Sequence, residues 1–326
     1  MFVIFILMES NKLIDNPFFS IVIPLYNKAE YIIDTLNSVK NQTYKNFEVI
    51  LINDGSTDNS SHKLEQISDT NFHIINQENQ GVSVARNNGI KNATGDYIAF
   101  LDADDYWYPN HLSEFIKSIK KHANESVFCN NYRIYQTKNK FKKTLFSYLP
   151  NNNQIQQIDN YFKSSFINDI AWTSAVCIKK NVFNTYTFDN SLRSTEDTDL
   201  WIRLGLTYSF IFNTCVTAKQ NKYVKNSLSK LNNLESKQHF LSKYIQQESQ
   251  NSSLKKYIDY NRFAIALEAK ERKEIVIYKK IIKGINRKNL NLKQQLLLNS
   301  PRWVIQILKK IKLLLEKSNI NILLYK

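Results

Sequence analysis

The stretch Tyr97-Ile-Ala-Phe-Leu-Asp-Ala-Asp-Asp105 joins five apolar residues to three carboxylates in the next four positions. An apolar run of this length fits a buried strand better than a helix, which needs about ten residues or more. The carboxylates then lie just beyond the end of that strand. The stretch therefore predicts a buried strand that delivers acidic side chains to one edge of a sheet.

The residues before this stretch repeat the same arrangement. Strand-like apolar runs occur at 20–24, 47–52 and 72–75, and helix-like stretches end near residue 42 and cover about 58–67 and 80–91. Strands that alternate with crossover helices give a mostly parallel sheet with helices on both faces, so we expect an α/β fold. Pro24 is expected to end the first strand, and Asn27 with Glu30 to form a capping box for the following helix.

Polar residues follow three of these strands at the point where each ends. Tyr26 and Asn27 follow the first strand, Asp54 the second, and Asp102 with Asp104 the fourth. In open α/β sheets, ligands bind beyond the carboxyl ends of the strands. We therefore expect these side chains to converge on one binding cleft.

The acidic run Asp102 to Asp105 is the sharpest local signal. Its carboxylates repel one another in a folded loop unless a cation or strong donors neutralise them. Hard divalent cations such as Mn²⁺ and Mg²⁺ take oxygen ligands and commonly join one or two carboxylates to a diphosphate. Asp102 and Asp104 are therefore candidate metal ligands. The alternative is a solvated acidic turn that caps a helix beginning near Pro109.

Two further residues could contact a nucleotide. Asp54, in Ile52-Asn-Asp-Gly-Ser56, could accept from the imide of a uracil or from a ribose hydroxyl, although a turn or helix cap is the competing role. Arg86, on the helix that leads to the acidic strand, could pair with a diphosphate or hold the carboxylates. The alternative for Arg86 is an ordinary surface arginine.

Four segments in order resemble family 2 glycosyltransferases: Ser20-Ile-Val-Ile-Pro-Leu-Tyr-Asn27, Asn53-Asp-Gly-Ser-Thr-Asp58, Gly81-Val-Ser-Val-Ala-Arg-Asn87 and Gly95-Asp-Tyr-Ile-Ala-Phe-Leu-Asp-Ala-Asp-Asp105. The resemblance covers roughly residues 18–215. It implies a GT-A fold, a Rossmann-like and mostly parallel sheet. It also implies a nucleotide-sugar donor, a divalent metal and inversion at the anomeric carbon, in an enzyme of the bacterial surface-polysaccharide type.

The resemblance also implies roles for the residues at matching positions. It places Tyr26 near the base and gives Asp54 to the base or ribose, and Arg86 to the donor phosphates. Asp102 and Asp104 would contact the ribose and the metal, Mn²⁺ or Mg²⁺. The nucleotide pocket as a whole would be lined by Pro24, Tyr26, Asn27 and Glu30.

The segment Thr195-Glu-Asp-Thr-Asp-Leu-Trp-Ile-Arg-Leu204 is similar to the acidic motif of the same family. By that likeness Asp197 is the general base that deprotonates the acceptor hydroxyl. The alternative is that Asp197 or a neighbouring carboxylate caps the short helix predicted for 197–206. The family often has glycine where this chain has Thr195, so the conformation of the preceding loop is a point for the structure to decide.

The rest of the chain divides by composition. Residues 131–170 are polar, and we expect them to form a variable segment that extends over the cleft. A strand is expected at 171–178. From Val216 to Lys326 there are 24 Lys and Arg against 7 Asp and Glu, whereas residues 1–215 are close to neutral. We therefore expect an N-terminal extension (1–17), a catalytic domain (18–225) and a helical basic region (226–326).

The last helix, predicted over Pro301 to Lys317, carries one apolar stripe with lysines mostly beside it. The stripe comprises Trp303, Val304, Ile307, Leu308, Ile311, Leu314 and Leu315. Such a helix could lie on an anionic membrane surface or pack on the catalytic domain, and the sequence leaves both open. A longer apolar segment that could span a bilayer is not visible, and residues 2–8 make a poor secretory signal.

The resemblance, together with the basic last helix, implies an enzyme that transfers a hexose-type sugar from a nucleotide-sugar, with UDP as the expected nucleotide, to a glycan or lipid-linked glycan. Three widely spaced cysteines suggest neither a disulfide framework nor a zinc site, which favours the cytoplasm, with attachment to the inner face of the cell membrane. The alternative is a non-catalytic protein whose basic region binds carbohydrate or nucleic acid. No known nucleic-acid-binding module occurs, so a nucleic-acid partner is not expected.

Overall fold

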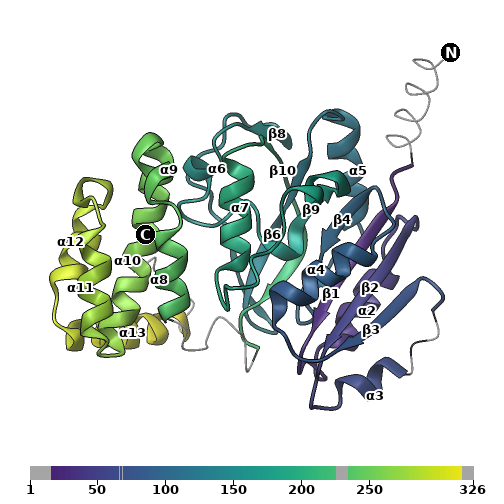
Figure 1. The fold of residues 1–326 in the computed structure, drawn as a ribbon, viewed down its shortest axis with the longest axis horizontal. Coiled ribbons are helices and arrows are strands. Elements are labelled where there is room, and N and C mark those ends of the chain that lie inside the picture. Colours follow the sequence, from purple (N-terminus) through teal and green to yellow (C-terminus); the bar gives the residue numbers. More distant parts are fainter. Residues whose placement is uncertain (1–15, 66, 68, 225–233, 318–326) are drawn as a thin grey trace.

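The computed structural model describes residues 16–65, 67, 69–224 and 234–317, so most of the predicted extension 1–17 lies outside the described residues. Within these ranges ten strands form one sheet, in the order β3-β2-β1-β4-β9-β6-β10-β5, with β7 paired to β6 and β8 to β10 (Figure 1). The strands are β1 (Phe19–Leu25), β2 (Phe47–Asp54), β3 (Phe72–Gln77), β4 (Tyr97–Phe100), β5 (Tyr106–Trp107), β6 (Val127–Thr137), β7 (Lys140–Lys143), β8 (Ile155–Ile158), β9 (Val176–Lys179) and β10 (Phe210–Asn221).

The first four strands of the chain, β1 to β4, are parallel, as the sequence predicts. β1 pairs in parallel register with both β2 and β4, and β2 pairs with β3. Beyond β4 the sheet is mixed, because β9 runs antiparallel to both β4 and β6. The prediction that Pro24 ends β1 is wrong, since the strand continues to Leu25. β4 pairs with β1 only as far as Val22, so the missing N–H of Pro24 costs no bond on that side.

Helices cover both faces of the sheet because alternate strand residues feed two separate cores. Ile21 and Ile23 of β1 pack with α2 and α5, whereas Val22 packs with α4 and α7. Gly89 lets α4 lie close, since a Cβ there would sit 2.4 Å from Val22 Cγ1. The helices are α2 (Ile32–Lys40), α3 (Ser60–Glu65), α4 (Val82–Asn92), α5 (His111–Lys121), α6 (Tyr161–Ser164) and α7 (Glu196–Gly205).

The capping box predicted at Asn27 and Glu30 is wrong. α2 begins only at Ile32, and its N-cap Tyr31 makes no side-chain capping bond. Asn27 instead has a left-handed backbone (φ 51°), and its side-chain oxygen accepts the N–H groups of Thr57 and Asp58 at 2.7 and 3.2 Å. Asn27 therefore ties the loop after β1 to the loop after β2, because asparagine tolerates this conformation.

Residues 131–170 are more regular than the sequence predicts. β6 runs into this segment, and β7, β8 and α6 follow. A pattern based on hydrophobicity does not detect β6, because the strand contains buried polar side chains. Asn130, for example, is fully buried, and its amide donates to the carbonyl of His111 at 3.1 Å. The strand predicted at 171–178 is a short 3₁₀ turn (Thr173–Ala175) followed by β9.

The C-terminal part is helical, as predicted, and packs beside α6 and α7 (Figure 1). Its central helix α10 contacts α6 on the sheet side, and its buried residues Leu254 and Ile258 belong to the same core as α7. The remaining helices surround α10. They are α8 (Leu234–Ser242), α9 (Ile245–Gln250), α11 (Ile275–Lys283), α12 (Leu292–Asn299) and α13 (Arg302–Lys317), and α10 itself spans Ser252–Glu271.

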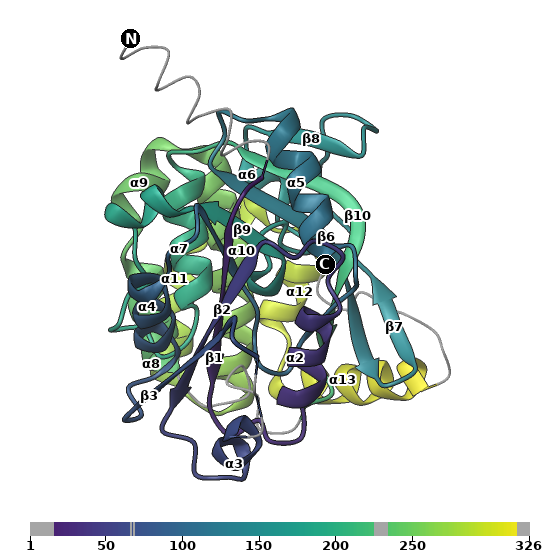
Figure 2. The ribbon, with the colours of Figure 1, turned by 90° about the vertical axis from the view of Figure 1, so that its right-hand side faces the viewer.

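The final helix, α13, lies along one margin of the molecule (Figure 2). The apolar stripe predicted for it is partly buried and partly exposed. Ile305, outside the predicted stripe, is fully buried, and Leu308 packs against the core. Trp303, Ile307 and Leu314 remain exposed, by 62%, 47% and 62%. One side of α13 therefore packs on the protein while much of the apolar stripe faces outward. Within the described ranges, no helix has the length and apolar character needed to cross a membrane.

Candidate active site

The carboxyl ends of β1, β2 and β4 lie at one edge of the sheet, because the three strands are parallel neighbours. The loops that follow them contact one another. Lys28, after β1, forms an ion pair of 2.8 Å with Asp104, after β4. Arg86 of α4 bonds Asp102 at 2.8 Å. The structure therefore brings together side chains that the sequence places up to about 76 positions apart.

Each carboxylate of the acidic run has its own partner from the protein. Asp102 pairs with Arg86 and Asp104 with Lys28. Asp105 is buried and accepts from the Ser174 hydroxyl at 2.7 Å. Burial raises the pKa of Asp104, with Lys28 opposing, and burial together with the charges of Asp104 and Asp102 raises the pKa of Asp105 well above its usual value. Each carboxylate of the run is thus held by a cation or a hydrogen-bond donor of the protein, while repulsion from its neighbours still acts on Asp105.

The alternative role for the acidic run, capping the next helix, is wrong. α5 begins at His111, and its N-cap Asn110 makes no side-chain capping bond. The backbone of the run is instead fixed from other elements. The Thr35 hydroxyl of α2 donates to the carbonyl of Ala103 at 3.0 Å, and the Asn221 amide of β10 donates to that of Asp104 at 2.6 Å. The loop is therefore held rigidly at the edge of the sheet.

Arg86 is the link between the two acidic segments and is only 3% exposed. One guanidinium nitrogen bonds Asp102, and the other bonds Glu196 at 2.8 Å. Burial acts to lower the pKa of Arg86, but the two carboxylates outweigh it and raise the pKa above its usual value. Of the roles open to it, holding the carboxylates is the one observed, and the surface-arginine alternative is wrong.

Asp54 is also buried, with 3% of its surface exposed. Its carboxylate accepts the Gln80 and Gly81 N–H groups, both at 2.9 Å, and the Gln77 side-chain amide at 2.8 Å. Asp54 thus fixes the turn that precedes α4. A carboxylate offers about four acceptor positions, so one remains for a ligand.

The other residues predicted to line the nucleotide pocket lie at the end of β1 or on the loop that follows it. Tyr26 is exposed by 40%, and Glu30 is exposed as well. Pro24 is half-buried near the end of β1, and Asn27 joins this loop to the one after β2. The loop therefore presents an accessible aromatic ring beside the Lys28–Asp104 pair.

Glu196 and Asp197 open α7 and have different surroundings. Glu196 is buried against Arg86, and burial followed by the charge of Asp197 raises its pKa to about 7 despite Arg86. Asp197 is half-buried: its Oδ1 accepts the Thr198 N–H at 2.6 Å, and its Oδ2 lies 3.4 Å from the Thr173 hydroxyl. Asp197 is therefore the more accessible carboxylate of the two.

Thr195, where the family often has glycine, adopts a left-handed backbone with φ 67°. This conformation costs a residue that has a side chain about 1–2 kcal/mol. Glycine avoids this steric cost but loses about 0.5–1 kcal/mol of conformational entropy. We expect Thr195→Gly to raise the free energy of unfolding by about 0.5–1 kcal/mol in urea denaturation. Thr198→Gly, inside α7, should lower it, because glycine is the poorer helix former. An equal gain in both variants would contradict the strain at Thr195.

Sequence reasoning missed Lys28, Ser174 and Asn221. Lys28 left a readable signal, a basic residue directly after a polar strand end. Ser174 and Asn221 left none, since they come from a 3₁₀ turn and from the end of β10 and reach the acidic loop only in the folded chain.

The donor set fits a divalent ion that takes most of its ligands from elsewhere. Among the residues that the structure describes, no three or more His, Cys, Asp or Glu side chains are grouped to hold a metal. Asp102 and Asp104 still supply two carboxylates, and ions bound to diphosphates commonly use only one or two from the protein. The Lys28 ammonium against Asp104 shows that a positive charge is accommodated there.

Comparison with known proteins identifies relatives of this chain. A family model described as "Glycosyl transferase family 2" matches residues 20–184. An uncharacterized glycosyltransferase of Rickettsia typhi is 30% identical over 239 residues, which cover 72% of this chain and 74% of that protein. One of Rickettsia bellii is also 30% identical, over 66% of this chain, but the chain spans only 31% of that relative's length.

Among solved structures, the crystal structure of S. aureus TarS 1-349 in complex with UDP-GlcNAc is similar, with a TM-score of 0.63. The match covers 83% of this chain and 82% of that one at 18% sequence identity. At this identity the likeness concerns the fold. It confirms the α/β fold with a mostly parallel central sheet and a helical C-terminal region that the sequence predicts.

Proposed function

The chain belongs to glycosyl transferase family 2 and has the GT-A fold, and from this premise we propose that it is an inverting glycosyltransferase. It transfers a hexose-type sugar from a nucleotide-sugar to an acceptor hydroxyl, with a UDP-sugar as the preferred donor. The UDP-GlcNAc bound to TarS supports a nucleotide-sugar donor. The observation that carries the proposal is the charged cluster in which Arg86 joins Asp102 to Glu196, next to Asp197.

The donor binds over the loops after β1, β2 and β4. Pro24, Tyr26, Asn27 and Glu30 line the nucleotide, and the remaining acceptor position of Asp54 serves the base or ribose. Asp102 would contact the ribose and, with Asp104, would hold Mn²⁺ or Mg²⁺. Such an ion, when bound, would supply positive charge to the departing diphosphate. Arg86 supports the donor phosphates by fixing Asp102, its partner at 2.8 Å.

Asp197 is the proposed general base. It accepts the proton of the acceptor hydroxyl as that oxygen attacks the anomeric carbon, and the bond from this carbon to the diphosphate oxygen breaks. Attack from the face opposite the leaving group inverts the configuration. Lys28, next to Asp104, offers a positive charge to the departing diphosphate. Glu196 is bound to Arg86 and is not available for this role.

Asp104→Ala tests the donor site. We expect wild-type protein to be stabilised by UDP only when Mn²⁺ or Mg²⁺ is added, by about 2.7 kcal/mol at a hundredfold excess over Kd. The variant should lose this gain in a thermal melt, because it lacks a ligand for the ion. Glu65→Ala, which removes an exposed carboxylate on α3, is the control and should keep it. Undiminished stabilisation of Asp104→Ala contradicts the assignment, and stabilisation by duplex DNA alone favours the nucleic-acid alternative.

The biological setting is also part of the proposal. We place the catalytic domain at residues 18–225 and a basic region at 226–326, of which the structure describes 234–317. The basic region holds the enzyme at the cytoplasmic face of the cell membrane. There it glycosylates a glycan or lipid-linked glycan during synthesis of surface polysaccharide. The support is the outward stripe of α13, in which Trp303 and Ile307 are exposed near Lys309 and Lys310.

Trp303→Glu combined with Ile307→Glu tests the membrane contact. Each exposed apolar side chain that enters the bilayer boundary contributes about 1.5–3 kcal/mol, so the double variant should bind at least tenfold more weakly. Flotation with vesicles of phosphatidylcholine and phosphatidylglycerol measures the binding. Gln306→Glu, exposed on the same helix, is the control for added charge. Equal flotation of all three proteins rules the contact out.

A further inference from the structure

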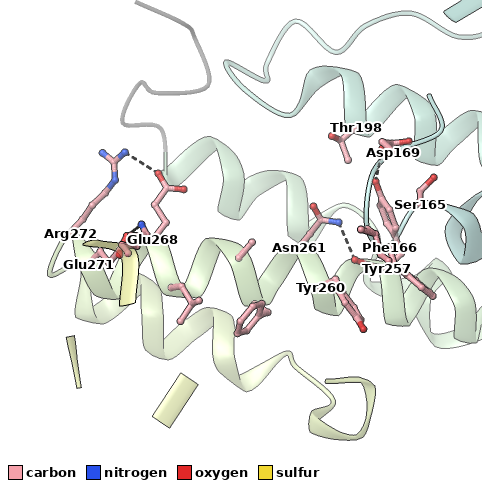
Figure 3. A pocket seen from close by; sticks show the side chains of 15 residues that line it. Ser165, Phe166, Asp169, Thr198, Tyr257, Tyr260, Asn261, Glu268, Glu271 and Arg272 are labelled. Atoms are coloured by element: carbon pink, nitrogen blue, oxygen red, sulfur yellow. Dashed lines mark hydrogen bonds and ion pairs between the residues drawn. The ribbon is translucent and has the colours of Figure 1, made fainter. Parts of the chain in front are cut away.

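A groove of about 620 Å³ runs between α10 and the sheet side of the molecule. Its walls are the loop 165–169, Thr198 of α7, one side of α10 from Tyr257 to Glu271 with Arg272 just after it, and Lys309 of α13. Figure 3 shows Asp169 and Thr198 at one end, and Glu268, Glu271 and Arg272 at the other. Fifteen residues of helix span about 22 Å, so the groove is longer than one sugar ring.

The groove begins beside the proposed base. Thr198 lines it and donates its N–H to Asp197 at 2.6 Å. Asp169, at the same end, is close enough for the charge of Asp197 to act on it. Burial, with a smaller contribution from that charge, raises the pKa of Asp169 to about 6. Arg86, Asp102 and Asp104 of the proposed donor site are not among the residues that line the groove, so the groove is separate from that site.

The lining alternates aromatic rings with hydrogen-bonding groups. Phe166 and Tyr260 stack with ring centres 5.2 Å apart, and the Tyr257 hydroxyl donates to Asp169 at 3.1 Å. Glu271 forms an ion pair with Lys309 through one oxygen. Its other oxygen, Oε1, is buried without a hydrogen-bond partner among the described residues. An unsatisfied buried acceptor is costly, and a hydroxyl donor from a ligand would relieve it.

We infer that this groove binds the acceptor as an extended glycan, with the hydroxyl to be glycosylated at the Thr198 end. The inference rests on the proposed function and adds the place at which its glycan acceptor binds. A sugar chain offers a hydroxyl donor to the unpartnered Oε1 of Glu271 and an apolar ring face to Tyr260. Asp169 is already bonded by the hydroxyls of Tyr161 and Tyr257 and by the Ala171 N–H.

The cations that line the groove are already paired, Arg272 with Glu268 and Lys309 with Glu271. A phosphate-rich chain would compete with these carboxylates, and an acyl chain would leave the Glu271 oxygen unsatisfied.

Ala264→Trp tests the groove by filling it, since Ala264 lines it and is exposed. Gln247→Trp, exposed on α9 outside the lining, is the matched control. The probes are tetrasaccharides of glucose, galactose and N-acetylglucosamine, and binding is followed by saturation-transfer NMR. We expect at least one probe to bind wild type and Gln247→Trp, and to bind Ala264→Trp at least tenfold more weakly. Tyr260→Ala removes part of the groove wall instead and should also weaken binding. It provides the test if Ala264→Trp does not fold.

UDP stabilisation with Mn²⁺, measured on the same proteins, separates this inference from the proposed function. The groove assignment is overturned when no probe binds wild type, or when Ala264→Trp and Tyr260→Ala bind the probe as wild type does. If the variants lose tetrasaccharide binding but the wild-type protein is not stabilised by UDP, the groove assignment stands and the proposal of a glycosyltransferase fails.

Discussion

Replacing Arg86 with alanine should lower the free energy of unfolding by about 3–5 kcal/mol, the cost of leaving a buried charge without its partner. Arg86 is buried, and its two bonds of 2.8 Å hold Asp102 and Glu196 together. Without the guanidinium, Glu196 must either carry an unpaired charge or stay protonated, and burial already raises its pKa to about 7. Urea denaturation at neutral pH measures the loss.

The control for this variant is Arg193→Ala. Arg193 is exposed and donates to the Gln80 carbonyl at 3.2 Å, so its loss should cost less than about 1 kcal/mol. Adding Glu196→Gln to the Arg86→Ala protein should restore part of the stability, since it removes one unpaired carboxylate. A loss at Arg86 no larger than at Arg193 would mean that the ion pairs do not hold the site together.

Asp197→Asn should slow sugar transfer by about 10²–10⁴-fold while donor binding is unchanged. The amide has almost the shape of the carboxylate and can still accept the Thr198 N–H, so the start of α7 is preserved. It cannot take a proton from the acceptor. The measurements are the transfer rate, with a donor and acceptor identified by screening nucleotide-sugars and glycans, and UDP stabilisation with Mn²⁺.

Glu235→Gln makes the same chemical change at an exposed site on α8 and should leave both measurements as in wild type. Glu196→Gln distinguishes the two neighbouring carboxylates. If transfer survives in Asp197→Asn but fails in Glu196→Gln with donor binding intact, the base is Glu196. Normal turnover in both variants would show that neither Asp197 nor Glu196 takes part in the chemistry.

The likeness in fold between this chain and TarS covers the C-terminal helices as well as the sheet, since the match extends over 83% of the chain. The family model, in contrast, ends at residue 184, before Asp197 and α10. The residues of the proposed donor side lie within the matched segment. The base and the acceptor groove rest on the geometry of this chain, which makes Asp197→Asn and Ala264→Trp the most informative variants.

The sequence by itself determined the alternation of strands and helices and the edge at which polar side chains gather. Both follow from local information: an apolar run such as Tyr97 to Leu101 needs burial, and parallel neighbours bring their carboxyl ends to one edge. The same local reasoning failed at Pro24 and Asn27. There the outcome depended on how far β4 extends along β1 and on the loop after β2.

Only the tertiary structure decided how the charges are paired. Arg86 meets Glu196 across 110 positions, Asn221 reaches Asp105 across 116, and α10 forms the groove by packing beside α7. Such partners leave no periodic trace, because each pair depends on the packing of whole elements and on the cost of burying a charge alone. The left-handed backbone at Thr195 belongs to the same class, since the surrounding fold and not the residue itself imposes it.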